Sequence, residues 1–94
     1  MNAITTRDKL EERIRRTPTP CDVTFDDFVL FLRHNGFTEQ TNQSSHYVYG
    51  CKINDHVYLI QFVRAHGASN YMKRNYVKKA IETIDEMRTQ LEME

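Results

Sequence analysis

Residues 24–36 read TFDDFVLFLRHNG, and this stretch predicts a helix with both ends marked. Thr24 can cap the helix, and the two aspartates after Phe25 place negative charge near its positive end. The apolar residues fall at helical spacing on one face: Phe25, Phe28, Val29 and Leu32. Asn35 and Gly36 provide the left-handed residue that commonly closes a helix. We therefore expect a helix from Phe25 to Asn35.

After Gly36 the chain becomes rich in β-branched and aromatic residues, which favour strands. Three short runs of this kind cover residues 37–41, 45–49 and 57–63. The polar stretches between them, 41–44 and 52–55, are short enough for hairpins, so the strands should form an antiparallel meander. Beyond a loop at 66–70, we expect a last helix from about Lys73 to about Gln90. Its apolar residues at helical spacing are Val77, Ala80, Ile81, Ile84 and Leu91.

The N-terminal part differs from the rest of the chain. Residues 4–16 carry Leu10 and Ile14 among charges, which predicts a short amphipathic helix, and a proline-containing linker follows at 17–20. We therefore divide the chain into an N-terminal helix with its linker, residues 1–22, and an α-β-β-β-α domain, residues 23–94. The fold class is α+β, with one face of a three-stranded antiparallel sheet covered by both helices and an extra helix at the N-terminus.

Composition limits the alternatives. The 94 residues are too few for two independent domains, and 13 Lys and Arg balance 13 Asp and Glu, so net charge alone does not indicate a polyanionic partner. Cys21 and Cys51 lack the spacing of a metal or redox motif, and no apolar run could span a membrane. We expect a cytoplasmic protein with reduced thiols.

Four short segments, in this order and spacing, resemble one known family. They are Asn35-Gly36-Phe37, Ser45-His46-Tyr47-Val48-Tyr49, His66-Gly67 and the run from Lys73 through Ile84. Over residues 23–87 the chain is similar to the HicA toxins of bacterial toxin-antitoxin pairs. Some longer members of that family also begin with a helix and a proline-containing linker. The chain departs from the family at Ser44, where HicA toxins have glycine, and at the neutral residues 41–43, where a basic residue is common.

This resemblance implies a double-stranded-RNA-binding-domain-like fold and an mRNA interferase, which cleaves RNA with the histidine of a Gly-Ser-His motif. That histidine corresponds to His46 here. The resemblance also implies a HicB-like antitoxin as partner, in a hetero-oligomer, and a metal-independent endoribonuclease without cofactor.

The chemistry of His46 is consistent with this role. Cleavage of RNA without a metal needs a group that takes the proton of the 2′-hydroxyl near neutral pH, and imidazole is suited to that. The other interpretation is an ordinary exposed strand histidine. A metal shared by His46 and His56 is excluded, because at about 3.3 Å per strand residue they lie roughly 16 Å apart, with His56 expected opposite Cys51.

RNA contacts are expected mainly from a run of bases. Between Arg64 and Lys79 there are five basic residues and no acidic one, and the start of the last helix also favours phosphate. Tyr71 is the best candidate for stacking on a base, and His66 lies in the adjoining loop. The expected RNA-binding residues are Ser45, Arg64, His66, Tyr71, Lys73, Arg74, Lys78 and Lys79. The alternative is a solvated helix face, on a non-catalytic RNA- or protein-binding domain of the same fold.

Overall fold

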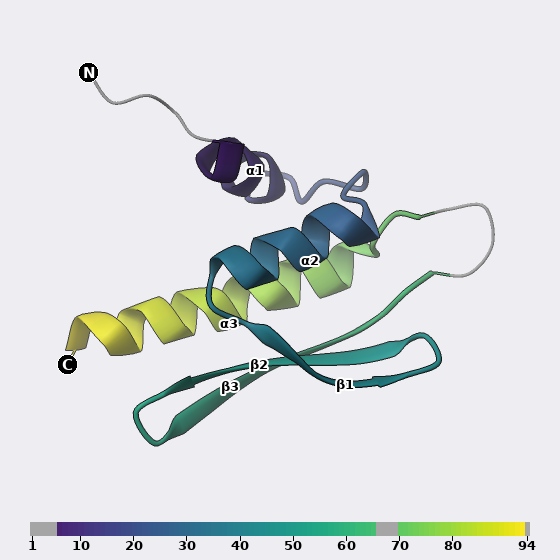
Figure 1. The fold of residues 1–94 in the computed structure, drawn as a ribbon. Coiled ribbons are helices and arrows are strands. Elements are labelled where there is room, and N and C mark those ends of the chain that lie inside the picture. The colour runs from purple at the N-terminus through teal and green to yellow at the C-terminus, as the bar shows by residue number, and fades with distance from the viewer. Residues whose placement is uncertain (1–5, 66–69, 94) are drawn as a thin grey trace.

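A computed structural model describes residues 6–65 and 70–93. The described helices are α1 (Thr6–Ile14), α2 (Phe25–His34) and α3 (Arg74–Met93), and the described strands are β1 (Thr38–Gln43), β2 (His46–Ile53) and β3 (His56–Val63). The α+β class and the element order are therefore as predicted (Figure 1). Each helix end lies within three residues of the predicted one. In the described part of the chain, no helix is both long and apolar enough to cross a membrane.

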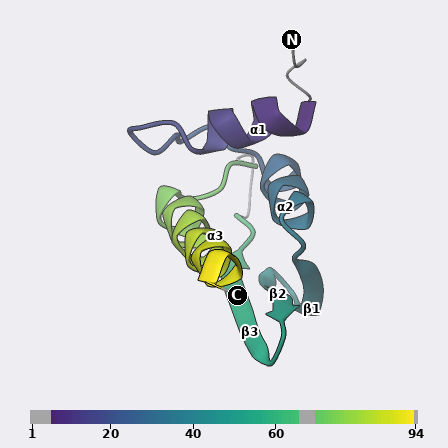
Figure 2. The same cartoon turned by 90° about the vertical axis from the view of Figure 1, so that its left-hand side faces the viewer.

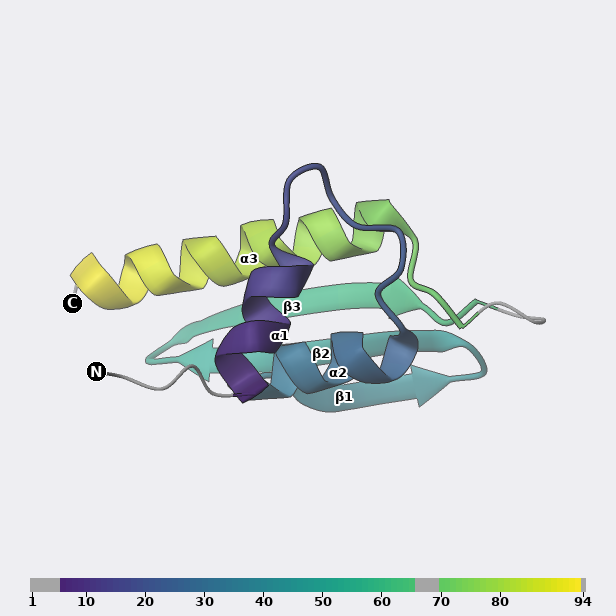
Figure 3. The same cartoon turned by 90° about the horizontal axis from the view of Figure 1, so that it is seen from above.

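The three strands form one antiparallel sheet in the order β1-β2-β3. Helices α2 and α3 lie on the same face of this sheet, and α1 lies on the far side of the helices from the sheet (Figures 1 and 2). Seen from above, α2 lies over β1 and β2, and α3 runs alongside β3 (Figure 3). The other sheet face has no described helix over it, as predicted for a sheet with both helices on one side.

The ends of α2 are formed by the predicted residues. The Asp27 N–H donates to Thr24 Oγ1 at 3.1 Å, so Thr24 is the N-cap. Gly36 has a φ of +88°, which lets Phe37 N–H reach the carbonyl of Leu32 at 3.0 Å and closes the helix. Asn35 caps the helix rather than continuing it. The chain is thereby turned toward β1, and Phe37 is fully buried between α2 and the sheet.

Both hairpins are tighter than the sequence indicated. The turns are Ser44-Ser45 and Asn54-Asp55, and the first residue of each has a positive φ, 59° for Ser44 and 53° for Asn54. The prediction that the second strand ends at Tyr49 is wrong, because β2 continues to Ile53 and stays paired with β3 throughout. The polar stretch 52–55 was expected to link the two strands, but the turn takes only Asn54-Asp55. Lys52 is exposed on the uncovered face and stays paired with Val57.

The core lies between the sheet and the helices and includes residues from all three helices. Leu10 and Ile14 of α1 belong to it, and Ile14 is fully buried. Leu91, which was expected on the apolar face of the last helix, is 48% exposed. The helical phase is right, but the last turn of α3 extends past the end of the sheet, so nothing covers that position (Figures 1 and 3).

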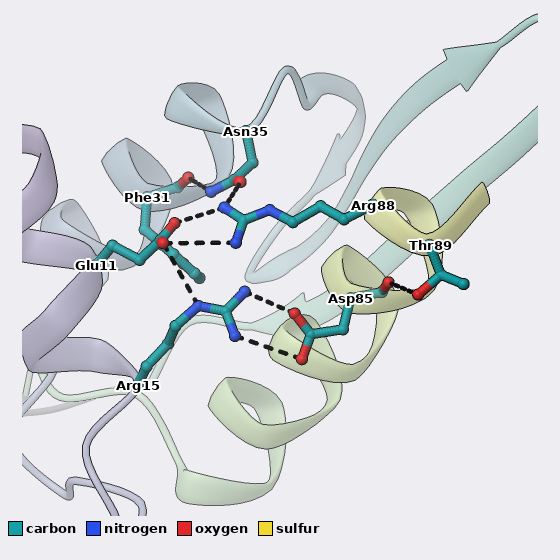
Figure 4. Close-up of polar contacts among 7 residues, drawn as sticks. All are labelled: Glu11, Arg15, Phe31, Asn35, Asp85, Arg88 and Thr89. Carbon is teal, nitrogen blue, oxygen red and sulfur yellow. Dashed lines mark hydrogen bonds and ion pairs between the residues drawn. The ribbon is translucent and has the colours of Figure 1, made fainter. Parts of the chain in front are cut away.

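Ion pairs attach α1 to α3 (Figure 4). Glu11 accepts from Arg88 at 2.6 Å, and Arg88 also donates to Asn35 at 2.6 Å. Arg15 binds Asp85 at 2.8 Å. The hydrogen bond from Arg88 holds the pKa of the Glu11 carboxyl below its ordinary value, against the opposing effect of partial burial. Helix α1 is therefore fixed by polar contacts as well as by its two buried side chains.

Candidate functional site

His46 is the first residue of β2, directly after the Ser44-Ser45 turn, and its side chain is exposed. Tyr47 packs against Phe25 and Phe62 in the core, so strand alternation places the His46 side chain on the uncovered sheet face. In the register of the sheet, His46 lies between Gln43 of β1 and Val63 of β3. The imidazole is thus reachable from solvent at one end of the sheet.

A depression of about 250 Å³ connects His46 with α3. It passes Gln61 and Val63 on β3 and reaches Tyr76 and Lys79 on α3. Among the described members of the predicted RNA-binding set, Lys79 lines this depression together with His46. An imidazole and an ammonium group on either side of one hollow could contact neighbouring parts of a phosphodiester chain.

The electrostatics at this end of the molecule favour an anion. The Ser44-Ser45 turn lies at the same end of the fold as the first turns of α2 and α3 (Figures 1 and 3). A helix N-terminus carries partial positive charge. In α2 this charge is offset by Asp26 and Asp27, whereas the first turn of α3 contains no acidic residue. The start of α3 is therefore the more positive of the two.

The basic residues of α3 do not form one strip. Lys79 shares one side of the helix with Tyr76, Thr83 and Glu86, along β3. Arg74 and Lys78 follow the spacing of Asp85 and Arg88, which bind α1, and therefore lie on the other side. Lys73 precedes the helix and lines a hollow with Val63, Arg64 and Tyr76. The structure thus brings Lys73 and Lys79 toward the His46 side and separates Arg74 and Lys78 from it.

Ser45 and Arg64 are joined through the backbone. Arg64 N–H donates to the Ser45 carbonyl at 2.8 Å, next to the His46–Val63 pair. The Arg64 guanidinium lies 4.4 Å from the centroid of the Phe25 ring, a cation–π contact on the core side of the sheet. The Arg64 side chain therefore packs on Phe25 in addition to contributing positive charge. The Ser45 side chain is almost fully buried.

The remaining expected residues occupy the connection into α3. Tyr71 forms an isolated bridge with Thr24 beside the start of α2 and is 50% exposed. Tyr49 and Tyr58 are buried in the core and cannot stack on a base. His66 and Gly67 lie outside the described residues.

The two sheet histidines, His46 and His56, lie far apart. His56 pairs with Ile53, not with Cys51 as expected, because the turn is Asn54-Asp55 and the register shifts accordingly. His46 and His56 still lie at opposite ends of the hairpin. In the ranges 6–65 and 70–93, no group of three or more His, Cys, Asp or Glu side chains is placed to hold a metal ion.

Sequence reasoning missed Gln61 and Tyr76, which line the depression beside His46. Gln61 becomes visible only with the correct register, because it is diagonal to His46 across β2 and β3. Tyr76 had a usable signal, since it lies one helical turn before Lys79.

The chain matches no protein-family model, no curated protein and no solved structure.

Proposed function

We propose that this chain is a HicA-like toxin that cleaves mRNA as a metal-independent endoribonuclease, with His46 as the catalytic residue. The observation that carries the proposal is the exposed imidazole at the start of β2, which shares a depression with Lys79. The resemblance of the segments around His46 to HicA toxins supports the same function. A double-stranded-RNA-binding-domain-like fold is part of this proposal, since the element order α-β-β-β-α fits it.

The reaction needs one proton acceptor and one proton donor. Imidazole of His46 takes the proton of a ribose 2′-hydroxyl, and the 2′-oxygen then bonds to the adjacent phosphorus. The bond from phosphorus to the 5′-oxygen breaks, and that oxygen leaves with a proton from imidazolium or water. The products are a 2′,3′-cyclic phosphate and a 5′-hydroxyl. Lys79, on the far side of the depression, is positioned to hold a phosphate during this step.

A nuclease of this kind harms the cell that makes it, so it requires a restraining partner. We propose a HicB-like antitoxin that binds this toxin in the cytoplasm. Coexpression with the product of an adjacent small gene would test that pairing by copurification and by relief of toxicity.

The decisive test is replacement of His46. His46→Gln keeps a polar side chain but cannot exchange a proton near neutral pH, so we expect cleavage to fall by about 10²–10⁴-fold, the usual contribution of general acid–base catalysis. We expect the same loss of cleavage for His46→Ala. His56→Gln is the matched control, because His56 is also exposed and lies at the opposite end of the same hairpin. All variants are assayed on one RNA in EDTA, with circular dichroism to verify folding.

A second candidate function is a non-catalytic RNA- or protein-binding domain. The separation of Arg74 and Lys78 from His46 favours it, because it reduces the cationic surface available around the imidazole. If folded His46→Gln protein cuts RNA at the wild-type rate, the nuclease proposal is wrong. If the wild type binds RNA and leaves it intact, the second function replaces the first.

A further inference from the structure

A long groove lies between β3 and α3. Adjoining hollows of about 670 and 440 Å³ follow it from His56 to Gln61, and two more continue it to Arg64 and Lys73. Glu82 and Glu86 line the first two hollows, and Lys79 lines the second and third. Val63 and Tyr76 line both the third and the fourth. Because each hollow shares residues with the next, the groove extends along β3.

The floor of the groove is an open strand edge. In the sheet order β1-β2-β3, β3 has a neighbour on one side only among the described strands. Arg64 N–H bonds to the Ser45 carbonyl, and this fixes which residues of β3 bond to β2: those at even positions from 56 to 62. The backbone N–H and C=O groups of the alternate residues therefore point to the open edge. They belong to Val57, Leu59, Gln61 and Val63.

The sequence of this edge lacks the residue types by which proteins prevent strand addition. Its eight residues, HVYLIQFV, include no proline, lysine, arginine or carboxylate, and its register with β2 has no bulge. Leu59 is 50% exposed and Val57 52%. The opposite edge of the sheet differs, because β1 has a register shift at Gln40 and consists of exposed polar residues. The contrast within one sheet favours β3 over β1 as the edge for strand addition.

The groove has charges of opposite sign at its two ends. Lys73, Arg64 and Lys79 lie toward the Val63 end. Glu82 and Glu86 lie toward the His56 end. Asp85 also lines that end, but it is paired with Arg15. A strand that adds antiparallel to β3, the more stable pairing, begins beside Val63 and ends beside His56. Complementary charge then requires acidic residues in its N-terminal half and basic residues in its C-terminal half.

We propose that this groove binds an extended segment of a partner protein as a fourth strand, with acidic residues first and basic residues last. Helix α3 flanks the open edge (Figures 2 and 3). A strand that adds there therefore cannot carry a second helix on the same side, because α3 occupies that space. That favours an isolated segment over β3 of a second copy, which would bring its own α3. Main-chain hydrogen bonds supply affinity in this mode, and side chains of the groove supply specificity. The inference does not depend on RNA cleavage or on His46.

A synthetic peptide tests the proposal. The probe is an eight-residue fluorescent peptide, matching the length of β3, with Asp and Glu in its N-terminal half, Lys in its C-terminal half and valine at alternate positions. We expect saturable binding by fluorescence anisotropy. A peptide with the two halves exchanged should bind about tenfold more weakly, a difference of about 1.4 kcal/mol. N-methylation of the amides that face β3 should abolish binding, since it removes the edge hydrogen bonds.

Charge exchange in the protein is the second arm. The double variant Glu82→Lys, Glu86→Lys should reverse the preference and bind the exchanged peptide more tightly than the original one. The control is Glu12→Lys with Glu92→Lys, which changes the net charge equally at exposed positions that line none of these hollows. The control should keep the original preference.

Amide hydrogen exchange locates the bound peptide. In the free protein the amides of residues 58, 60 and 62 are hydrogen-bonded to β2 and should exchange slowly, whereas those of 57, 59, 61 and 63 should exchange fast. Peptide binding should protect the fast set. Equal binding of both peptides, or no change in these amides, overturns the proposal. Protection of the same amides by a single-stranded RNA and not by the peptide makes the groove a nucleic-acid surface and also overturns it.

Discussion

Ser44 holds a backbone conformation that side chains disfavour. Its φ of 59° places it in the left-handed region, in the turn directly before the candidate catalytic strand. Under the proposed resemblance to HicA toxins, which have glycine before the Ser-His pair, this φ gives a physical reason for that glycine, because glycine adopts it without steric cost. The departure at Ser44 therefore changes the stability of the turn more than its shape.

We expect Ser44→Gly to raise the free energy of unfolding by up to about 1 kcal/mol, since relief of left-handed strain outweighs the greater entropy of unfolded glycine. Ser45→Gly is the matched control. Ser45 does not have a positive φ and is nearly buried, so its replacement should lower stability. Urea denaturation of both variants measures the difference, and equal destabilisation would show that the turn at Ser44 is unstrained.

At the scale of elements, α3 separates its basic residues onto two sides. If RNA binds along the His46 side, Lys73→Ala with Lys79→Ala should reduce the salt dependence of binding, with the slope of log K against log salt falling by about 0.7 per lost phosphate contact on single strands. Arg74→Ala with Lys78→Ala should change the slope little. Filter binding across a salt series compares the pairs, and an equal loss in both would place RNA over the whole start of α3.

Helix α1 should make stability depend on pH. Glu11 has a lowered pKa because of Arg88, so its ionised form stabilises the folded state. This contribution is fully present above the ordinary glutamate pKa of 4.5 and is lost as the pH falls through the lower, folded-state value. We expect the wild type to be more stable than Glu11→Gln at pH 7, and the gap to close below pH 4.5. A gap that stays constant as the pH falls well below 4.5 would contradict this.

At the scale of the whole molecule, one core joins α1, α2, α3 and the sheet. Leu32→Ala and Ile14→Ala should each cost about 2–5 kcal/mol, because both side chains are fully buried. Ile81→Ala should cost less than either, since Ile81 is only partly buried and packs at the margin of the core. Chemical denaturation measures all three. A small loss for Ile14→Ala alone would mean that α1 contributes little to the core.

The sequence predicted those parts of the fold that depend on local signals. Thr24 and Gly36 marked α2, and a run of β-branched and aromatic residues marked β3, because capping and strand propensity act over a few residues. The extent of β2 could not be predicted, since the pairing of Lys52 with Val57 depends on the position of the turn. Leu91 had the right helical phase, but whether a core reaches it is a property of the tertiary structure.

The candidate site, like the fold, was predictable where it depends on local signals in the sequence. Position and exposure of His46 follow from its place after a polar turn, and these could be expected from the sequence. The grouping of Lys79 with His46 could not, because it depends on how α3 is rotated against β3. The split between Lys79 and Arg74 is a matter of helical phase, which a linear count of charges does not contain.

The register shift at Gln40 has a consequence for the size of any assembly. A sheet grows into a fibril when each unit offers two compatible edges, so that every addition creates the next site. Among the described strands, β3 is the one that offers such an edge. Copies that met edge to edge would therefore stop at a pair, and strand addition by a partner would give a fixed stoichiometry of one segment per chain instead of an open polymer.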